Sequence, residues 1–221
     1  MKKLYILAVT VLIISCKETD RKTTPQKQTV ITSIPQKKVK KFNHDSIREQ
    51  AIKYFTNNKN YYFNTLNNAK GVATVNDNFV FGDTITLLKE NGEISSQFIF
   101  NDENNIHTFK CISTDSLYYK VEYNNETLYL KKSDKFTFEP WEIHVLKVPF
   151  IGFDYSKNSI HEYPNDDSKT ISFDPDTFYS PVQLAGKWMQ IVWADSNNNN
   201  KYGWIKWKEN DKLIIELFYF A

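Results

Sequence analysis

The chain has 221 residues, of which 15% are aromatic and 24% are charged, and its formal net charge at pH 7 is +2. Two cysteines are too few for a network of disulfide bonds or for a metal site made of sulfur ligands. The composition therefore excludes a disulfide-rich scaffold and a cysteine zinc site.

Residues 1–15 have the parts of a secretory signal peptide. Lys2 and Lys3 supply a basic start, an apolar run extends from Leu4 to Ile14, and Ser15 is the small residue at the cut. The apolar run is too short to span a bilayer stably. We therefore expect residues 1–15 to be removed on export.

The residues Ile13-Ile14-Ser15-Cys16 resemble the lipobox of bacterial lipoproteins. The resemblance implies that Cys16 is the lipid attachment site and the first residue of the mature chain. The alternative is a plain secretory signal with an incidental cysteine. Residues 16–20 are also partly similar to the surface-export signal of Bacteroidota lipoproteins. Together these resemblances imply a lipid-anchored protein of the cell envelope, at the outer membrane and facing the periplasm or the surface.

Residues 16–44 are predicted to form a disordered basic tether, because their hydrophobicity is too low to offset the entropy of ordering. From position 17 to 44 there are eight basic residues, against the acidic Glu18 and Asp20. Such a tether favours anionic lipid head groups. The remaining chain is acidic, so we expect no nucleic-acid partner.

Residues 45–69 are predicted to contain one short amphipathic helix and a connector. Ser46 and Glu49 have the spacing of a capping box, and we expect Ser46 to be the N-cap. Apolar residues then follow at helical spacing, namely Ile47, Ala51, Ile52 and Phe55. A helix this short cannot bury its own apolar face, so we expect it to pack against later elements.

From Gly71 onward the apolar residues alternate and turn residues are frequent, which predicts a mainly β fold of short antiparallel strands. The expected strands cover residues 78–88, 98–100, 109–113, 117–123, 127–131, 144–148, 188–193, 204–207 and 213–220. Asn91-Gly92 and Asn124-Asn125 are predicted hairpin turns. Strands without intervening helices argue against a parallel α/β sheet.

Two predicted hairpins look like copies of each other, which suggests a duplication. In each, an aromatic residue is followed by an aliphatic one, a polar turn, and an aromatic-aliphatic pair. The matched pairs are Tyr118 with Trp188, Val121 with Ile191, Tyr123 with Trp193, Tyr129 with Trp204, and Leu130 with Ile205.

The second hairpin resembles the late hairpin of bacterial SH3-like domains through Gly203-Trp204-Ile205. In the first hairpin Leu128 replaces the glycine. The resemblance implies two small SH3-like barrels, a divergent one over residues 70–143 and a second over 144–221. The alternative for residues 70–143 is another small β fold. The resemblance also implies a non-catalytic module that binds peptidoglycan or wall peptide.

Five aromatic residues near the second hairpin are the candidate ligand-binding residues: Trp188, Trp193, Tyr202, Trp204 and Trp207. Tryptophan offers a large contact area with few rotamers to freeze. The alternative is that most of these rings form the core of a small barrel. We expect Tyr202, at the end of the long turn, to be the most exposed.

No catalytic residue, metal or cofactor is expected. Cys111 lies in an alternating strand and is interpreted as a buried apolar residue, the alternative being a nucleophile with His107 or His144 as base. The acidic pairs Asp166-Asp167 and Asp174-Pro175-Asp176 have no apolar setting for glycosidase chemistry. The segment from Asp195 lacks the glycine and glutamate of a calcium loop.

The sequence thus predicts a non-enzymatic, lipid-anchored envelope protein that binds a cell-wall component through its aromatic-rich SH3-like domain. Its membrane partner is reached through the N-terminal lipid. The alternative function is a scaffold or accessory subunit of an envelope protein complex, with an apolar docking patch such as Phe218-Tyr219-Phe220.

Overall fold

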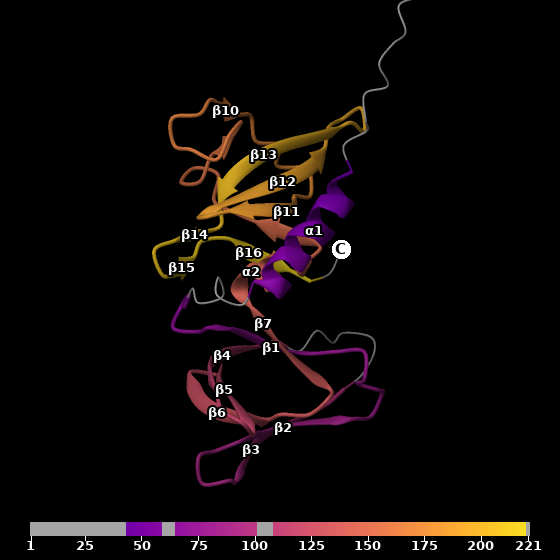
Figure 1. Ribbon diagram of the computed structural model, residues 1–221, viewed down its shortest axis with the longest axis vertical. Helices are drawn as coiled ribbons and strands as arrows, with labels where there is room; N and C mark the ends of the chain where they lie inside the picture. The colour runs from indigo at the N-terminus through magenta and orange to yellow at the C-terminus, as the bar shows by residue number, and fades with distance from the viewer. Residues whose placement is uncertain (1–42, 59–64, 101–107, 220–221) are drawn as a thin grey trace, which may run out of the picture. The chain divides into compact units, whose positions relative to one another are not determined.

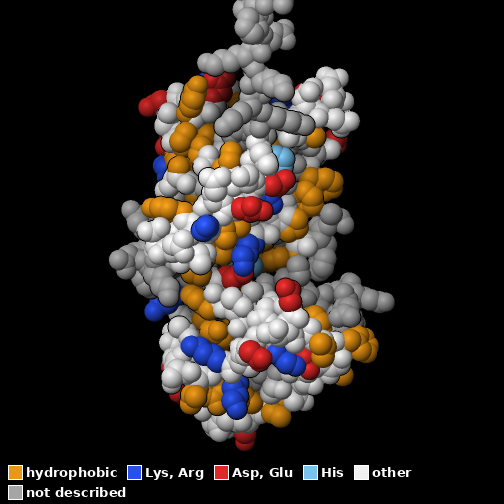
Figure 2. All heavy atoms as spheres, turned by 45° about the vertical axis from the view of Figure 1, so that its right-hand side comes forward, with side chains coloured by type: hydrophobic (Ala, Val, Ile, Leu, Met, Phe, Trp, Pro, Cys, Tyr) orange, Lys and Arg blue, Asp and Glu red, His pale blue; other side chains and the backbone are white. Residues whose placement is uncertain are grey.

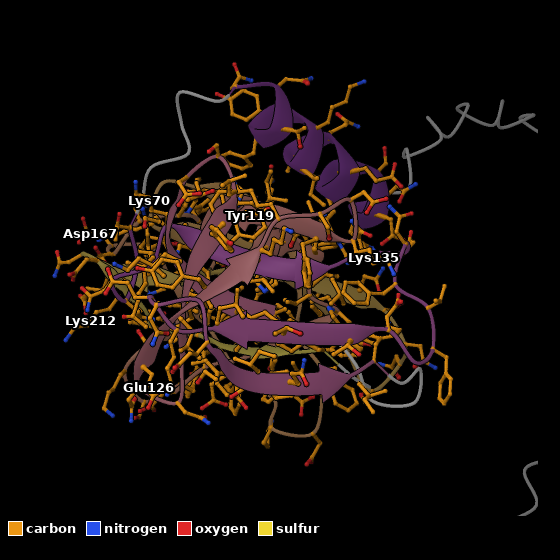
Figure 3. All side chains as sticks on the ribbon, turned by 90° about the horizontal axis from the view of Figure 1, so that it is seen from below. Lys70, Tyr119, Glu126, Lys135, Asp167 and Lys212 are labelled. Carbon is orange, nitrogen blue, oxygen red and sulfur yellow. The ribbon has the colours of Figure 1, made fainter. Side chains whose placement is uncertain are left out.

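The computed structural model describes residues 43–58, 65–100 and 108–219. The expected signal peptide, Cys16 and nearly all of the expected tether lie outside these residues. The described elements are mainly antiparallel strands with two helices (Figure 1). Figure 3 shows a buried aromatic ring, Tyr119, among the strands, with the charged side chains of Glu126 and Lys212 at the outside.

The first sheet has seven strands in the order β3-β2-β6-β5-β4-β1-β7. Its strands are β1 Gly71–Val75, β2 Thr84–Leu88, β3 Ile94–Ile99, β4 Thr108–Thr114, β5 Tyr118–Tyr123, β6 Glu126–Lys131 and β7 Phe136–Pro140. Apolar side chains of its strands, with Phe79 from the connection between β1 and β2, form one buried cluster: Ala73, Phe79, Ile85, Leu87, Phe109, Cys111, Tyr119, Val121, Leu128 and Leu130.

The second sheet has five strands in the order β10-β9-β13-β12-β11, and two small two-stranded sheets accompany it. The strands are β8 Phe150–Gly152, β9 Ile160–His161, β10 Thr170–Ile171, β11 Ser180–Ala185, β12 Trp188–Ala194, β13 Asn200–Lys206, β14 Lys208–Glu209, β15 Lys212–Leu213 and β16 Glu216–Phe218. A second buried cluster includes Met189, Ile191 and Trp207 from this region together with Val72 of β1.

Both parts of the fold repeat the same order of elements. An opening strand, β1 or β8, pairs with a closing strand, β7 or β16. Between them lie a hairpin, β2–β3 or β9–β10, and a meander, β4–β5–β6 or β11–β12–β13, whose last strand neighbours the hairpin's first strand. The opening strand neighbours the first meander strand, through β1–β4 pairs in one part and an Ile151–Tyr179 bridge in the other.

The two hairpins matched in the sequence also share one pairing register. Tyr118 lies opposite Lys131 as Trp188 lies opposite Lys206, and Val121 lies opposite Leu128 as Ile191 lies opposite Gly203. Asn124 and Asn125 have positive φ angles of 51° and 63°, as a two-residue turn of this hand requires.

Neither sheet closes on itself through the hydrogen bonds of the described strands, since β3 and β7 remain the two ends of the first sheet and β10 and β11 the ends of the second. The mainly β class is therefore confirmed. The finer expectation of two closed barrels is not established by this topology.

The helix α1, His44–Asn57, begins earlier than the capping box predicts. Asn43 is the N-cap, and its side-chain oxygen accepts a hydrogen bond from the Ser46 amide at 3.3 Å. The prediction that Ser46 is the cap is wrong, because Ser46 Oγ instead accepts from Gln50 at 3.1 Å inside the helix. The expected apolar stripe is partly buried, and α1 packs against β11 and α2.

The predicted strand over residues 144–148 is wrong. These residues lie in and just after α2, Trp141–Lys147, which starts after Pro140 and is followed by Val148 and Pro149. Trp141, Val145 and Val148 are buried at helical spacing. A helix of two turns has too few residues for that spacing to stand out against alternation.

Strand boundaries differ most near turns and at the chain end. Of the predicted strand 78–88, only Thr84–Leu88 forms β2, because Gly82 turns the chain with a φ of 88°. The predicted strand 213–220 is divided between β15 and β16. Strands β1, β7 and β11 were not predicted. β1 is buried on both faces and β11 has adjacent buried residues, so neither shows a clear alternation. β7 alternates apolar and polar residues, but only over the short stretch Phe136–Pro140.

Candidate functional site

The five candidate aromatic residues do not form one exposed cluster. Trp188, Trp193 and Trp207 are 5%, 6% and 1% exposed, and the Trp207 indole donates a hydrogen bond to the Gly186 carbonyl at 2.9 Å. These three rings therefore serve the interior. Tyr202 and Trp204 are half-buried, so they are the two candidates that can also meet a ligand.

Trp204 stands in a row of side chains that crosses four strands of the second sheet. His161, Trp204, Gln190 and Gln183 are direct neighbours on β9, β13, β12 and β11. All four are half-buried, and the Gln183 amide donates to the Gln190 side chain at 2.7 Å. Side chains that are paired across strands point to one face. This aromatic-amide row offers a flat indole beside hydrogen-bonding amides.

Tyr202 lies two residues before Trp204 on the same face and also lines a hollow of about 530 Å³ at the end of the β12–β13 hairpin. Trp193, Phe173, Asp174, Asp195 and Lys201 line it as well. Lys201 lies 3.3 Å from the Asp195 carboxylate. The hollow thus combines aromatic walls with charges of both signs.

The acidic residues of the loops stabilise turns and form surface ion pairs. Asp195 Oδ1 accepts the Asn197 and Asn199 amides, both at 2.9 Å. The Asn199 amide is the main cause of the lowered pKa of Asp195. The Asp166 carboxylate pairs with Lys206 and Lys187, which hold its pKa below the usual range. No group of three His, Cys, Asp or Glu side chains within the described ranges is placed to hold a metal.

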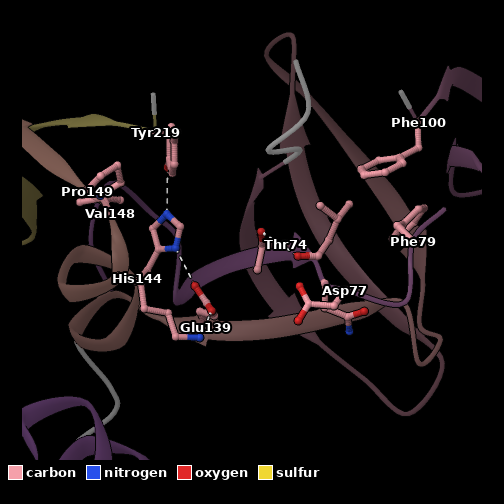
Figure 4. A pocket seen from close by; sticks show the side chains of 12 residues that line it. Thr74, Asp77, Phe79, Phe100, Glu139, His144, Val148, Pro149 and Tyr219 are labelled. Atoms are coloured by element: carbon pink, nitrogen blue, oxygen red, sulfur yellow. Dashed lines mark hydrogen bonds and ion pairs between the residues drawn. The ribbon is translucent and has the colours of Figure 1, made fainter. Parts of the chain in front are cut away.

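A buried polar cluster that the sequence did not reveal lies where β7, α2 and the segment after β16 meet. His144 Nδ1 lies 2.8 Å from Glu139 Oε2, and His144 Nε2 lies 2.8 Å from the Tyr219 hydroxyl (Figure 4). Lys147 pairs with the other Glu139 oxygen. Glu139 and His144 are 6% and 3% exposed. The sequence offered one signal for this cluster, the prolines Pro140 and Pro149 on either side of α2. A helix between them places His144 and Lys147 on one face.

The protons in this cluster follow from its partners. Burial opposes ionisation of Glu139, but hydrogen bonds and charges from His144 and Lys147 outweigh burial, and its pKa is lowered. A carboxylate can only accept, so His144 Nδ1 carries the proton and Nε2 faces the Tyr219 hydroxyl. Burial raises the pKa of Tyr219, which keeps the phenol protonated. In the neutral imidazole, Nε2 therefore accepts from Tyr219.

Cys111 lies in the first core at 0% exposure, and its thiol lies 3.2 Å from the Ser113 carbonyl. Burial raises the pKa of this thiol to about 11. This environment disfavours the thiolate that a nucleophile needs. His107, the other expected partner, lies outside the described residues.

Charges of both signs are mixed among hydrophobic side chains on the face that Figure 2 shows. Within residues 43–58, 65–100 and 108–219, no helix has the length and apolar character to cross a membrane.

Comparisons of the chain with protein-family models, with curated proteins and with solved structures find no match.

Proposed function

We propose that this chain is a non-enzymatic, lipid-anchored protein of the cell envelope that binds a cell-wall component, peptidoglycan or wall peptide, through the second sheet. The observation that carries the proposal is the aromatic-amide row of His161, Trp204, Gln190 and Gln183. A flat indole packs against sugar or peptide while amides fix its orientation. Tyr202 extends this surface into the neighbouring hollow.

The repeated order of elements supports the finer proposal of two SH3-like domains. Gly203, the glycine of the SH3-like motif, is buried where β13 passes β9, and a Cβ there would lie 2.3 Å from Ile160 Cγ2. The motif glycine thus has a packing role in the second sheet. At the equivalent position of the first sheet Leu128 is buried instead, which fits a divergent first copy.

Sedimentation with insoluble peptidoglycan tests the binding proposal. The chain carrying Cys16→Ser, which cannot be acylated, is expected in the pellet, and Trp204→Ala in the same background is expected in the supernatant. Phe178→Ala is the matched control, because Phe178 is 68% exposed and lies outside the aromatic-amide row. If the Cys16→Ser chain with Trp204 intact stays in the supernatant at every salt concentration, the proposal is contradicted.

The lipid anchor has a separate test. Labelled palmitate is expected to enter the natural chain but not the Cys16→Ser chain when both are expressed in a bacterial host. Incorporation into both chains, or into neither, contradicts acylation at Cys16 without bearing on the wall-binding surface.

A scaffold role is the second candidate, and one observation favours it. Phe218 and Phe178 are 46% and 68% exposed and line an aromatic hollow of about 350 Å³ with Phe150 and Phe153. Exposed apolar patches of this kind mark protein contacts. Crosslinking in intact cells separates the two functions, because a single abundant protein adduct that Phe178→Ala abolishes favours the scaffold.

A further inference from the structure

The polar cluster of Glu139, His144 and Tyr219 forms one wall of a cavity of about 550 Å³ (Figure 4). The cavity lies away from the aromatic-amide row, since its other walls come from β1, from the β1–β2 connection and from the end of β3. A cavity of this size suits a small molecule.

Opposite the polar cluster the cavity has an aromatic wall. Phe79 and Phe100 line it with their ring centroids 5.2 Å apart. Aromatic faces attract cations. Phe79 already shows this property, because the Lys135 ammonium lies 5.5 Å from its ring centroid.

The polar groups of the cavity have an excess of acceptors. Both Glu139 oxygens are engaged by His144 and Lys147, so this lysine is already committed. The exposed Asp77 carboxylate also lines the cavity, and the described lysines and arginines form no ion pair with it. Thr74 donates its hydroxyl proton to the Val75 carbonyl at 3.4 Å, so toward a ligand its oxygen would act as an acceptor.

Burying a carboxylate, an imidazole and a phenol together is costly for stability, and apolar side chains of similar volume would often be at least as stable. Buried ionisable clusters at the wall of a cavity are therefore candidates for a functional site. Here hydrogen bonds with His144 and Thr108 hold the Tyr219 hydroxyl at a fixed place in the wall.

We propose that this cavity binds a small organic ammonium compound, with the charged nitrogen between Asp77, Thr74 and Tyr219 and the apolar body against Phe79 and Phe100. The Asp77 carboxylate and the two oxygen acceptors satisfy the three protons of a primary ammonium, and the carboxylate balances its charge. The aromatic wall packs against the apolar body of the ligand. Anions are disfavoured, because the lysine of the cavity is paired and Asp77 would repel them.

Three probes that share a benzyl or phenyl body but differ in charge test the proposal: benzylamine, benzyl alcohol and benzoate. Each is titrated into the isotope-labelled full chain carrying Cys16→Ser, and amide NMR shifts are followed. Benzylamine is expected to shift Thr74, Asp77 and His144, with an affinity at least about 5-fold above that of benzyl alcohol at low salt. Benzoate is expected to cause no shift there.

Asp77→Asn is expected to remove the advantage of benzylamine over benzyl alcohol, and it should fold because Asp77 is exposed. Asp176→Asn, another exposed carboxylate in a turn of the second part, is the matched control and should leave the affinities unchanged. Equal binding of benzoate and benzylamine overturns the proposal. So do the absence of shifts up to about 10 mM and shifts confined to the Phe150–Phe178 hollow. None of these results bears on peptidoglycan sedimentation.

Discussion

Cys111 lies in β4 with its side chain inside the first core, and burial raises its pKa to about 11. The nearby Lys132 and Lys70 act in the opposite direction but do not outweigh burial. At about pH 8 the thiolate fraction is therefore roughly one in a thousand. We predict that iodoacetamide leaves Cys111 of the folded Cys16→Ser chain unmodified and labels it in urea, which mass spectrometry can follow. Rapid labelling of the folded chain would contradict the buried assignment.

Glu139 gives stability a defined dependence on pH. Its pKa is lowered in the folded state because His144 and Lys147 outweigh burial. A lowered carboxyl pKa stabilises the fold above the unfolded value of about 4.3, and this contribution is lost as pH falls through the folded pKa. We predict that Glu139→Gln lowers the free energy of unfolding at about pH 7 by about 3–5 kcal/mol.

The pH dependence distinguishes this cluster from simple packing. Urea unfolding at about pH 7 and about pH 3 should show a smaller difference between the natural side chain and Glu139→Gln in acid, because at about pH 3 the unfolded state binds the Glu139 proton and the stabilisation from its lowered folded pKa is being lost. Asp176→Asn, in an exposed turn, should match the natural chain at both values. An equal loss at both pH values would mean that the charge of Glu139 does not contribute.

At the scale of elements, the sequence predicted those strands in which apolar residues alternate and turn residues mark the ends. β5 and β6 around Asn124-Asn125 are the clearest case. It failed where tertiary contacts decide the outcome. β1 is buried on both faces and has no period of two, and α2 is too short for its helical spacing to show. The start of α1 was missed because Asn43 and Ser46 are both good caps, and local spacing does not decide between them.

The candidate site was also predicted only in part, because sequence patterns indicate local structure and not the contacts between distant elements. Sequence spacing indicated the aromatic hairpin, and the pairing of β12 with β13 brings Trp204 beside Gln190. It did not indicate Gln183, because β11 was not predicted as a strand, nor His161, which reaches the row from the earlier strand β9. Nor did it indicate that Tyr219 meets His144, 75 positions earlier in the chain. Contacts of this kind depend on the fold rather than on local pattern.

Packing between β13 and β9 leads to a prediction at Gly203. Its Cβ would lie 2.3 Å from Ile160 Cγ2, so Gly203→Ala is expected to cost about 1–3 kcal/mol of unfolding free energy. Ile160→Leu removes the branched methyl, so the double variant should lose less than the sum of the single variants. Urea unfolding of the four chains measures this coupling. Strictly additive losses would show that contact with Ile160 Cγ2 is not the reason why position 203 requires glycine.

At the scale of the whole described fold, β1 joins the two cores. Adjacent residues of this strand enter different clusters, Val72 the second and Ala73 the first. Trp141, at the start of α2, donates to the Ala69 carbonyl just before β1 at 2.9 Å. The two repeated parts are therefore connected through β1 and α2. The hydrogen bonds among Glu139, His144 and Tyr219 also connect them. A substitution that destabilises one core should therefore also destabilise the other.

Tryptophan fluorescence can report this coupling, because all five tryptophans lie at or after position 141 and none in the first sheet. Ile85→Ala empties a fully buried position of the first core and should cost about 2–5 kcal/mol. If the cores unfold together, the urea midpoint seen by tryptophan falls with that seen by circular dichroism, and the slope is unchanged. Thr84→Ala, an exposed change in the same strand, should leave both midpoints in place. A tryptophan transition that keeps its original midpoint in Ile85→Ala, while circular dichroism shows an earlier phase, would mean that the two cores unfold independently.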